Sequence, residues 1–415
     1  MNFKSVLFGL LCIAGAVTSA RAQTVPSEIK IGKLYASTGP YAAISMPVQN
    51  SMKMWVDQVN AEGGVFVKPY NKKIPVKLIS YDDQSSTATA ATMYNQLITQ
   101  DKVDLLVTDS GSVMTSVAVP IAKEHKQFLF NVSGTGAAFF TPDNPYIALI
   151  TSPVSTVYPK IVADFLNTAG VEHGIKSVAI LYSTNDFTGT QAKWFKTYIE
   201  QAGKIKIVYD QGVPTTTSNY TVLINNIAGA KADAVVHLGY VGNDIAFFRN
   251  LQESGEHFKF AFGIYVGMEE EELVQTVGAT GLTDVFSYVP PTVANRRPDF
   301  GPTLAEYRAM WDKAFPNGSG GAFGANAIYG YLTGQIIEQA LARTKSLDQL
   351  DIREAVFSMS GKLKTLAGNF ELASDGSQTG ELMPLGQLQS DGKGGVKLVV
   401  LEPPDLATGK PIFAK

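Results

Sequence analysis

Residues 29–65, IKIGKLYASTGPYAAISMPVQNSMKMWVDQVNAEGGV, carry the pattern that decides the fold. A run that alternates apolar with small or polar residues leads into Ser-Thr-Gly-Pro at residues 37–40, and apolar residues then recur about every 3.6 positions. This order predicts a strand, a polar turn and a helix that ends at Gly63 and Gly64. The residues expected on the buried face of the helix are Val48, Met52, Trp55 or Val56, and Val59.

The same strand-and-helix alternation recurs along the chain and predicts the fold class. Four such units fall within about a hundred residues, which is typical of a doubly wound parallel sheet. The proline-rich residues 142–153 have no helical period and are interpreted as a crossover, after which residues 177–262 repeat the alternation. Pro290 and Pro291 predict a second crossover, and the helical stretch 325–343 is expected to pack back on one of the lobes.

These patterns predict two doubly wound α/β lobes that are joined by several chain crossings and enclose a hinged cleft. Loops that follow parallel strands lie at the ligand-binding edge of such a sheet, so residues 37–41 form a first candidate loop. The expected division is residues 23–150 plus about 291–380 in lobe one, and residues 151–290 plus about 381–415 in lobe two and the hinge segments.

The N-terminus has the features of a secretory signal peptide. Lys4 precedes an apolar run at residues 6–17, and the series Ala-Arg-Ala ends at Ala22. Cleavage after Ala22 would leave 393 residues, more than one core usually serves, and would place the protein in the periplasm. The only cysteine, Cys12, lies inside the leader, so disulfides, thiolate catalysis and cysteine metal sites are excluded in the mature chain.

Composition and spacing argue against several function classes. Removal of the leader takes two cations and changes the formal net charge from −3 to −5, and no basic run suggests a nucleic-acid surface. The four histidines are far apart, which argues against a metal site. Phe139 breaks the nucleotide-binding pattern that begins at Gly134, so no cofactor is expected. The acidic run at residues 269–272 is interpreted as a solvated helix start.

Small polar residues follow two neighbouring predicted strands. Ser110 and Ser112 precede a helix, and Ser133, Gly134 and Thr135 occupy the equivalent place after the next strand. Amides and hydroxyls at a helix N-terminus can receive an anionic group, although simple N-capping would use the same residues. For a single loop, the residues alone leave both anion binding and helix N-capping open. Two such loops side by side favour anion binding.

Aromatic residues form a second candidate group. Tyr41, Phe187, Tyr240 and Tyr265 each fall in or just beyond a loop at the carboxyl end of a predicted strand. A single aromatic at a strand end more often seals a core than contacts a ligand. Four of them at the same edge of two facing lobes would make an apolar pocket with polar tips.

The ordered motifs of the chain resemble one known family. They are IKIG, TGP, NAEGG, YDDQSS, PIAKEH, SGT, YSTNDFTG and LGYVGND, which lie between residues 29 and 244, and the resemblance runs over nearly the whole mature chain. Together they resemble periplasmic solute-binding proteins of the type I fold, in the branched-chain amino acid (Leu/Ile/Val) binding group that feeds ABC importers. The resemblance implies that a ligand carboxylate is held by the loops at Ser112 and residues 133–135. Phe187, Tyr240 and Tyr265 would close over it from lobe two.

Two departures from the family pattern bear on the ligand. The position that often carries an acid for an α-ammonium group aligns with Tyr265, and the aromatic commonly found after the TGP loop aligns near Ile44. A carboxylate without an ammonium group, such as an aromatic or aliphatic acid, therefore fits better than an α-amino acid. Tyr41 and Ile44 are expected to shape the pocket wall.

The resulting hypothesis is a non-enzymatic, extracytoplasmic receptor. It would bind a small carboxylate-bearing solute, which is a hydrophobic or branched-chain amino acid or a related aromatic or aliphatic acid. Hinge closure would capture the solute, and the protein would deliver it, as a monomer, to the membrane subunits of an ABC permease. A receptor that signals through a separate partner and a binder of an amide- or urea-type solute are the alternatives. A secreted hydrolase or dehydrogenase is disfavoured because no nucleophile–base pair or nucleotide loop is evident.

Overall fold

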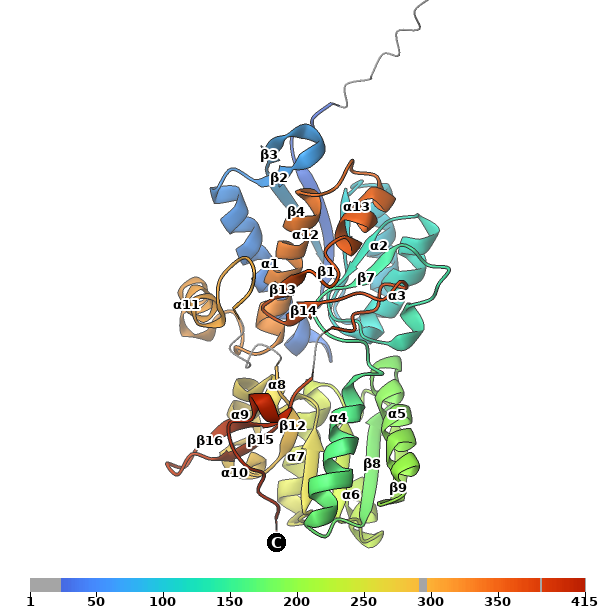
Figure 1. The fold of residues 1–415 in the computed structure, drawn as a ribbon, viewed down its shortest axis with the longest axis vertical. Helices are drawn as coiled ribbons and strands as arrows, with labels where there is room; N and C mark the ends of the chain where they lie inside the picture. The colour runs from blue at the N-terminus through green and yellow to red at the C-terminus, as the bar shows by residue number, and fades with distance from the viewer. Residues whose placement is uncertain (1–23, 291–296, 381–382, 415) are drawn as a thin grey trace, which may run out of the picture.

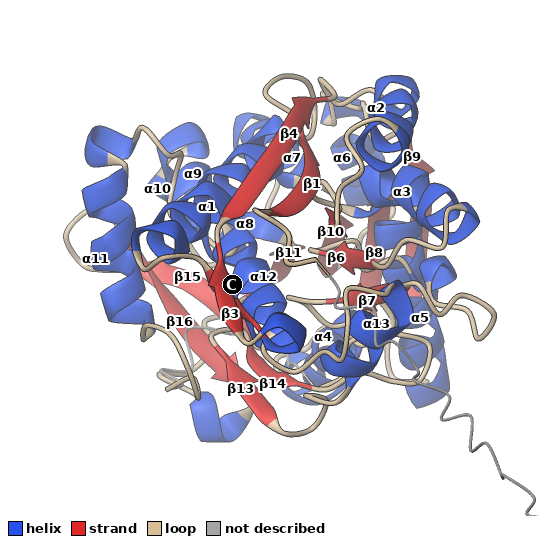
Figure 2. Ribbon diagram, turned by 90° about the horizontal axis from the view of Figure 1, so that it is seen from above, coloured by secondary structure: helices blue, strands red, loops and turns tan. Residues whose placement is uncertain are grey.

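The computed structural model describes residues 24–290, 297–380 and 383–414, and its chain forms two lobes that lie one above the other (Figure 1). Each lobe contains one large sheet. Figure 2 shows the helices arranged around the strands of both sheets. The predicted signal peptide, residues 1–22, lies outside the described residues. The α/β class predicted for two lobes is confirmed.

The first sheet is parallel throughout, with strand order β4-β1-β5-β6-β7. Helices connect most of its successive strands, as a parallel sheet requires. Its strands are β1 (Ile29–Tyr35), β4 (Val76–Asp82), β5 (Leu105–Val107), β6 (Leu129–Asn131) and β7 (Ile147–Leu149), and its helices are α1 (Ala42–Ala61), α2 (Thr87–Thr99) and α3 (Ser112–Glu124).

The stretch that opens the sequence folds as predicted. β1 leads through a polar turn into α1, whose residues Val48, Met52 and Val59 are buried. Gly63 and Gly64 have positive φ angles of 91° and 100°, which end the helix. A short hairpin, β2 (Val65–Val67) with β3 (Lys72–Ile74), follows it and is too short to show a period in the sequence.

The second sheet has the order β16-β15-β12-β11-β10-β8-β9. β15 and β16 are antiparallel to their neighbours, whereas the remaining pairs are parallel. Its strands are β8 (Ser177–Ser183), β9 (Lys206–Val213), β10 (Ala234–Leu238), β11 (Phe260–Gly263), β12 (Phe286–Tyr288), β15 (Leu385–Ser390) and β16 (Val396–Glu402). The helices between β7 and β12 are α4 (Tyr158–Phe165), α5 (Asp186–Ala202), α6 (Thr221–Gly229), α7 (Val241–Ser254), α8 (Tyr265–Met268), α9 (Glu270–Val277) and α10 (Ala279–Leu282).

The chain returns to the first lobe for α11 (Leu304–Ala314), α12 (Asn326–Leu341), α13 (Gln349–Phe357) and the hairpin β13 (Leu363–Thr365) with β14 (Gly368–Phe370). α12 packs against α1, so the long helix does pack back on an existing lobe. Gly330 and Gly334 allow this close approach. A Cβ atom would lie 2.0 Å from the carbonyl oxygen of Val48 at the first glycine, and 2.2 Å from the Trp55 ring at the second.

Three connections join the lobes, between β7 and α4, between β12 and α11, and between β14 and β15. Residues 291–296 and 381–382 of the second and third connections, including Pro291, lie outside the described residues. The prediction of an irregular crossover at residues 142–153 is partly wrong, because β7 lies inside it. A three-residue strand flanked by Pro145 and Pro153 is too short to produce an alternating pattern.

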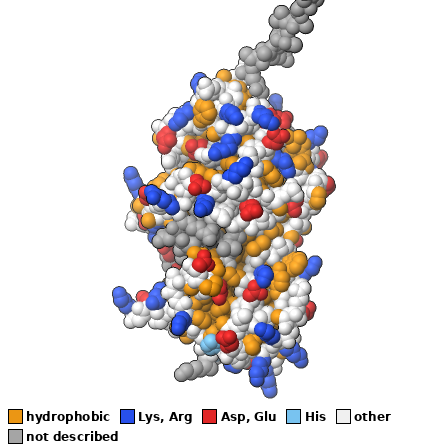
Figure 3. All heavy atoms as spheres, in the orientation of Figure 1, with side chains coloured by type: hydrophobic (Ala, Val, Ile, Leu, Met, Phe, Trp, Pro, Cys, Tyr) orange, Lys and Arg blue, Asp and Glu red, His pale blue; other side chains and the backbone are white. Residues whose placement is uncertain are grey.

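Acidic and basic side chains are interspersed over the face of the molecule that Figure 3 shows, with exposed apolar side chains between them. No helix within residues 24–290, 297–380 and 383–414 is long and apolar enough to cross a membrane.

Candidate functional site

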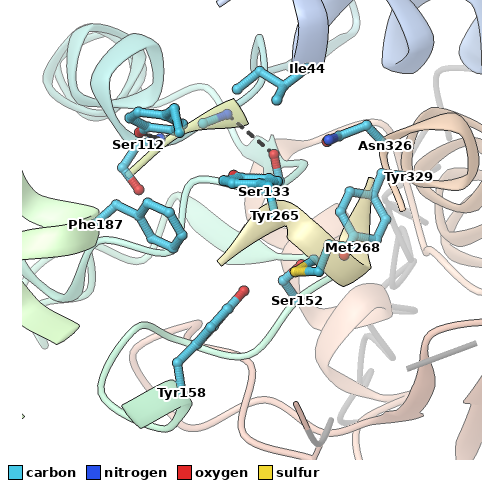
Figure 4. A pocket seen from close by; sticks show the side chains of 12 residues that line it. Ile44, Ser112, Ser133, Ser152, Tyr158, Phe187, Tyr265, Met268, Asn326 and Tyr329 are labelled. Carbon is cyan, nitrogen blue, oxygen red and sulfur yellow. Dashed lines mark hydrogen bonds between the residues drawn. The ribbon is translucent and has the colours of Figure 1, made fainter. Parts of the chain in front are cut away.

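A pocket lies where the carboxyl edges of the two sheets face each other. Its space is about 380 Å³, counting the part that opens to solvent. Both lobes contribute residues to it, and Figure 4 shows their side chains around the central space. The lining residues are Ile44, Gly111, Ser112, Ser133, Ser152, Tyr158, Phe187, Tyr240, Tyr265, Met268, Asn326 and Tyr329.

Lobe one contributes three serines from the loops after β5, β6 and β7. The hydroxyl oxygen of Ser133 accepts the N–H of Gly111 at 3.2 Å, and that of Ser112 accepts the N–H of Gly136 at 3.1 Å. A hydroxyl that accepts from the backbone still has its own O–H to donate. Ser152, from the loop after β7, adds a third hydroxyl, so this side of the pocket offers several donors.

Gly111 makes the approach of the two lobes possible. It precedes the first residue of α3 and has a φ of 78°, a conformation that residues with a Cβ rarely adopt. A Cβ here would lie 3.0 Å from Ile44 and 3.3 Å from the Tyr240 ring. The N-terminus of α3, with its positive dipole end, is therefore brought to the pocket.

Lobe two contributes a continuous aromatic wall. The ring centroids of Phe187 and Tyr240 are 5.5 Å apart, those of Tyr240 and Tyr265 are 6.3 Å apart, and those of Tyr158 and Phe187 are 5.9 Å apart. These separations are the ones that aromatic pairs prefer. The four residues come from α4, α5, α7 and α8, or from the position just before the helix, at the carboxyl edge of the second sheet.

The wall makes direct contact with lobe one. The Tyr240 hydroxyl oxygen accepts the N–H of Ser112 at 3.2 Å, and its ring meets Tyr41 edge-on at 5.5 Å. Burial raises the pKa of Tyr240, so the hydroxyl is neutral at physiological pH. A second bond, from the N–H of Ala138 to Asp186 Oδ2 at 3.3 Å, also crosses between the lobes. The two lobes are therefore closed on each other here.

Glu269 corrects one expectation from the sequence. The run at residues 269–272 was expected to be a solvated helix start, but Glu269 is only 3% exposed. Its Oε1 accepts the backbone N–H of Asn326 at 3.0 Å and the Asn326 side-chain Nδ2 at 2.7 Å. Burial raises the pKa of Glu269 to about 8. The sequence pattern missed this because its partner is 57 residues away and lies in the other lobe.

No charged side chain is present among the twelve lining residues of this pocket; they are apolar, aromatic, hydroxyl-bearing or amide-bearing, besides one glycine. An ammonium group buried there would lack a carboxylate partner, which is costly. A carboxylate would instead meet hydroxyl donors and the N-terminal end of α3. Within the described ranges, no group of three or more His, Cys, Asp or Glu side chains could hold a metal ion.

The ten residues proposed from the sequence fall into two groups in space. Those that line the pocket are Ile44, Ser112, Ser133, Phe187, Tyr240 and Tyr265. Those that lie behind the lining are Tyr41, Ser110, Gly134 and Thr135. Tyr41 packs on Tyr240, Ser110 is fully buried, Gly134 donates its N–H to Asn131 at 2.8 Å, and the Thr135 hydroxyl bonds to that of Ser155 at 2.8 Å.

Six lining residues were missed by sequence reasoning: Gly111, Ser152, Tyr158, Met268, Asn326 and Tyr329. Gly111 lies inside a loop that the sequence did single out. Ser152 and Tyr158 follow β7, the strand that gave no periodic signal. Asn326 and Tyr329 lie on α12, which is buried along most of its length, so its sequence shows no face directed at a ligand.

A buried pair supports the backbone of Tyr265. Asp244 Oδ2 accepts the Tyr265 N–H at 2.7 Å, and Asp244 Oδ1 lies 2.6 Å from His237 Nδ1. The His237 ring stacks on Phe247 with centroids 4.4 Å apart. Burial raises the pKa of Asp244, and the contact with His237 opposes that shift. The pair therefore positions one member of the aromatic wall.

A second buried cluster lies beneath the loops of lobe one. Lys33, Asp83 and Asp109 are all fully buried, and Lys33 Nζ lies 3.8 Å from Asp109 Oδ1. Burial lowers the pKa of Lys33 and raises that of Asp109, and it raises the pKa of Asp83 to about 7. The Asp83 and Asp109 carboxyls interact, and one proton shared between them would remove the excess negative charge. Asp109 directly precedes Ser110, so the cluster underlies the serine side of the pocket.

Comparisons with known proteins agree with this arrangement. The family described as "Periplasmic binding protein" matches residues 28–393, and the chain belongs to that family. A Leu/Ile/Val-binding protein homolog 7 of Brucella abortus (strain 2308) is 21% identical over 392 residues, covering 92% of this chain and 94% of that protein. The two-lobed fold is thus that of a type I periplasmic binding protein.

Two solved structures have the same fold. The branched-chain amino acid transporter substrate-binding protein LivJ of Streptococcus pneumoniae, solved with isoleucine, has a TM-score of 0.72 and 21% identity, with 91% of this chain and 100% of that one covered. An ABC transporter solute-binding protein of R. palustris, solved with benzoate, has a TM-score of 0.73 and 17% identity, with 94% and 98% covered.

Proposed function

We propose that this protein captures a small carboxylate-bearing solute outside the cytoplasm and delivers it to the membrane subunits of an ABC importer. The observation that carries the proposal is the interlobe pocket, in which hydroxyl donors face an aromatic wall and no charged side chain is present among the lining residues. Its family supports the same role, because the matched relatives are solute-binding proteins.

The side of the pocket that carries Ser112, Ser133 and Ser152 would hold the carboxylate of the ligand. Ser112, Ser133 and Ser152 can each donate an O–H to it, and the N-terminal end of α3 favours negative charge. Phe187 and Tyr265 would cover the body of the ligand by apolar contact. An aromatic or aliphatic acid fits this pocket better than an α-amino acid, because no acidic side chain of the lining could pair with an ammonium group.

Hinge closure would couple binding to delivery. We take residues 23–150 plus about 291–380 and residues 151–290 plus about 381–415 as the two bodies that move about the three connections. Opening would break the bond between Tyr240 and Ser112 and the bonds between Glu269 and Asn326. A ligand that contacts both lobes would favour the closed form, which is the form that a permease would recognise.

The proposed cellular location and oligomeric state follow from the same role. The predicted leader at residues 1–22 would export the chain to the periplasm, where it would act as a monomer. A pull-down from membranes with the closed protein should recover ABC permease subunits. Recovery of a sensor kinase instead would favour the signalling role.

Isothermal titration calorimetry with carboxylic acids of increasing size tests the binding role. A micromolar or tighter dissociation constant, about −8 kcal/mol or better, is expected for at least one aromatic or aliphatic acid. Ser133→Ala should weaken binding of that acid by roughly tenfold or more, because a hydrogen bond to a charged group contributes about 1.5–3 kcal/mol.

The matched control is Ser116→Ala, which lies on the exposed side of α3 and should leave the affinity unchanged. The proposal fails if no acid binds, or if the methyl ester of the best acid binds as tightly as the acid.

A further inference from the structure

Asn326 presents a defined hydrogen-bonding group to the pocket. It is the first residue of α12, is 4% exposed and lines the cavity. Its backbone N–H and its side-chain Nδ2 both donate to Glu269 Oε1, at 3.0 and 2.7 Å. Glu269 can accept these bonds whether or not its other oxygen carries a proton. The contact therefore sets the orientation of the Asn326 amide.

The remaining polar atom of that side chain is the carbonyl oxygen, Oδ1. Within residues 24–290, 297–380 and 383–414, no donor makes a hydrogen bond to it. An amide oxygen can only accept, so a ligand group that meets it must be a donor. A buried acceptor without a donor is unfavourable, so ligands that lack the donor would bind less tightly.

The Ser112 hydroxyl and the Asn326 amide lie on different sides of the pocket, and Ser133 lies between them (Figure 4). Figure 4 shows Ser112 and Phe187 on one side of the central space, with Asn326, Tyr329 and Met268 on the other. The aromatic wall lies along the space between them. A complementary ligand would carry a carboxylate at one end, a flat apolar body, and an uncharged donor at the other end.

An α-amino acid does not match this layout. Its ammonium is attached to the carbon next to the carboxylate, so it would lie at the serine side and away from Asn326. Glu269 is occupied by the two donors of Asn326 and does not belong to the pocket lining. A hydroxyl group on the far side of a ring supplies a neutral donor that is remote from the carboxylate.

We infer that Asn326, oriented by Glu269, selects aromatic carboxylates that carry a hydroxyl group remote from the carboxylate. This inference rests on the proposed function, since it takes the carboxylate end as given. Asn326 is a specificity-determining residue in this scheme, and Glu269 is its positioning residue.

Calorimetric titration of the full-length mature protein with five probes tests the inference. The probes are benzoate, 3-hydroxybenzoate, 4-hydroxybenzoate and the two corresponding methoxybenzoates, which keep the oxygen but cannot donate. At least one hydroxybenzoate should bind about tenfold more tightly than benzoate and than its own methoxy analogue. Equal affinity of the wild type for benzoate and both hydroxybenzoates would overturn the inference, as would binding of aliphatic acids only, and both results would leave the proposed function standing.

The variant Asn326→Leu removes the acceptor at similar volume. It should reduce the ratio of hydroxybenzoate affinity to benzoate affinity to about one, and the lost bond to Glu269 should weaken both acids equally. Asn226→Leu, on the exposed face of α6, is the matched control and should keep the wild-type ratio. Persistence of the preference in Asn326→Leu would overturn the inference. If that variant does not fold, the wild-type series alone decides, and failure of all acids to bind would instead refute the proposed function.

Discussion

The bond between Tyr240 and Ser112 gives the sharpest test of the closure mechanism. Tyr240→Phe removes one hydroxyl oxygen and leaves the ring in its contacts with Phe187 and Tyr265. The Ser112 N–H, which is buried in the closed form, then loses its acceptor. The net cost of such a loss is about 1–2 kcal/mol, and it falls on the closed form alone because the bond joins the two lobes.

The expected consequence is a weaker apparent affinity rather than a less stable fold. Because binding requires closure, about 1–2 kcal/mol taken from the closed form should raise the apparent dissociation constant by about 5–30-fold. The unfolding midpoint of the ligand-free protein should change little. Calorimetry gives the affinity, and small-angle X-ray scattering with and without ligand gives the compactness.

Tyr198→Phe, on α5 of the same lobe, is the control, since it removes a hydroxyl away from the pocket. The reasoning would be refuted if Tyr240→Phe had an unchanged dissociation constant and became as compact as the wild type when ligand is added. A large drop in the unfolding midpoint would show that the hydroxyl serves stability instead of closure.

Two further predictions concern the buried groups beneath the pocket. Asp244→Ala removes the acceptor of the Tyr265 N–H and the partner of the His237 ring, so the Tyr265 side chain should shift and calorimetry should show binding about tenfold weaker. The exposed Asp164→Ala is the control, and an unchanged affinity in Asp244→Ala would contradict the positioning role. For Asp83 the pKa of about 7 lies above the ordinary value of 3.8, so the folded state binds the extra proton and stability should fall as pH rises from about 4 to about 7. Asp83→Asn mimics the protonated form of Asp83 and should flatten this pH dependence. At about 1.4 kcal/mol per pKa unit, it should raise the free energy of unfolding at pH 8 by up to about 4 kcal/mol. Urea denaturation at several pH values measures the free energy of unfolding, and an unaltered pH slope would contradict the shared-proton account.

Most of the architecture could be predicted from the sequence alone, apart from β7 and the hairpin of β2 and β3. Residues 29–65 showed a strand, a turn and a helix because their apolar residues are spaced by local backbone geometry, and the same holds for most elements of both sheets. The loops after parallel strands identify the binding edge without any coordinates, which is why Ser112, Ser133 and Phe187 could be proposed. The resemblance to a known family, which rests on short motifs in a fixed order, predicted the same fold.

Tertiary structure decided which side chains line the pocket. Thr135 and Ser133 share a loop, yet Thr135 bonds to Ser155 behind the lining while Ser133 faces the cavity. Asn326 obtains its orientation from Glu269, a residue in the other lobe that the sequence pattern assigned to solvent. A strand or helix is set by neighbours within a few positions, whereas a pocket is set by contacts between segments far apart in the chain. The chemistry of recognition in this protein therefore depends on the packing of its two lobes, which no local pattern encodes.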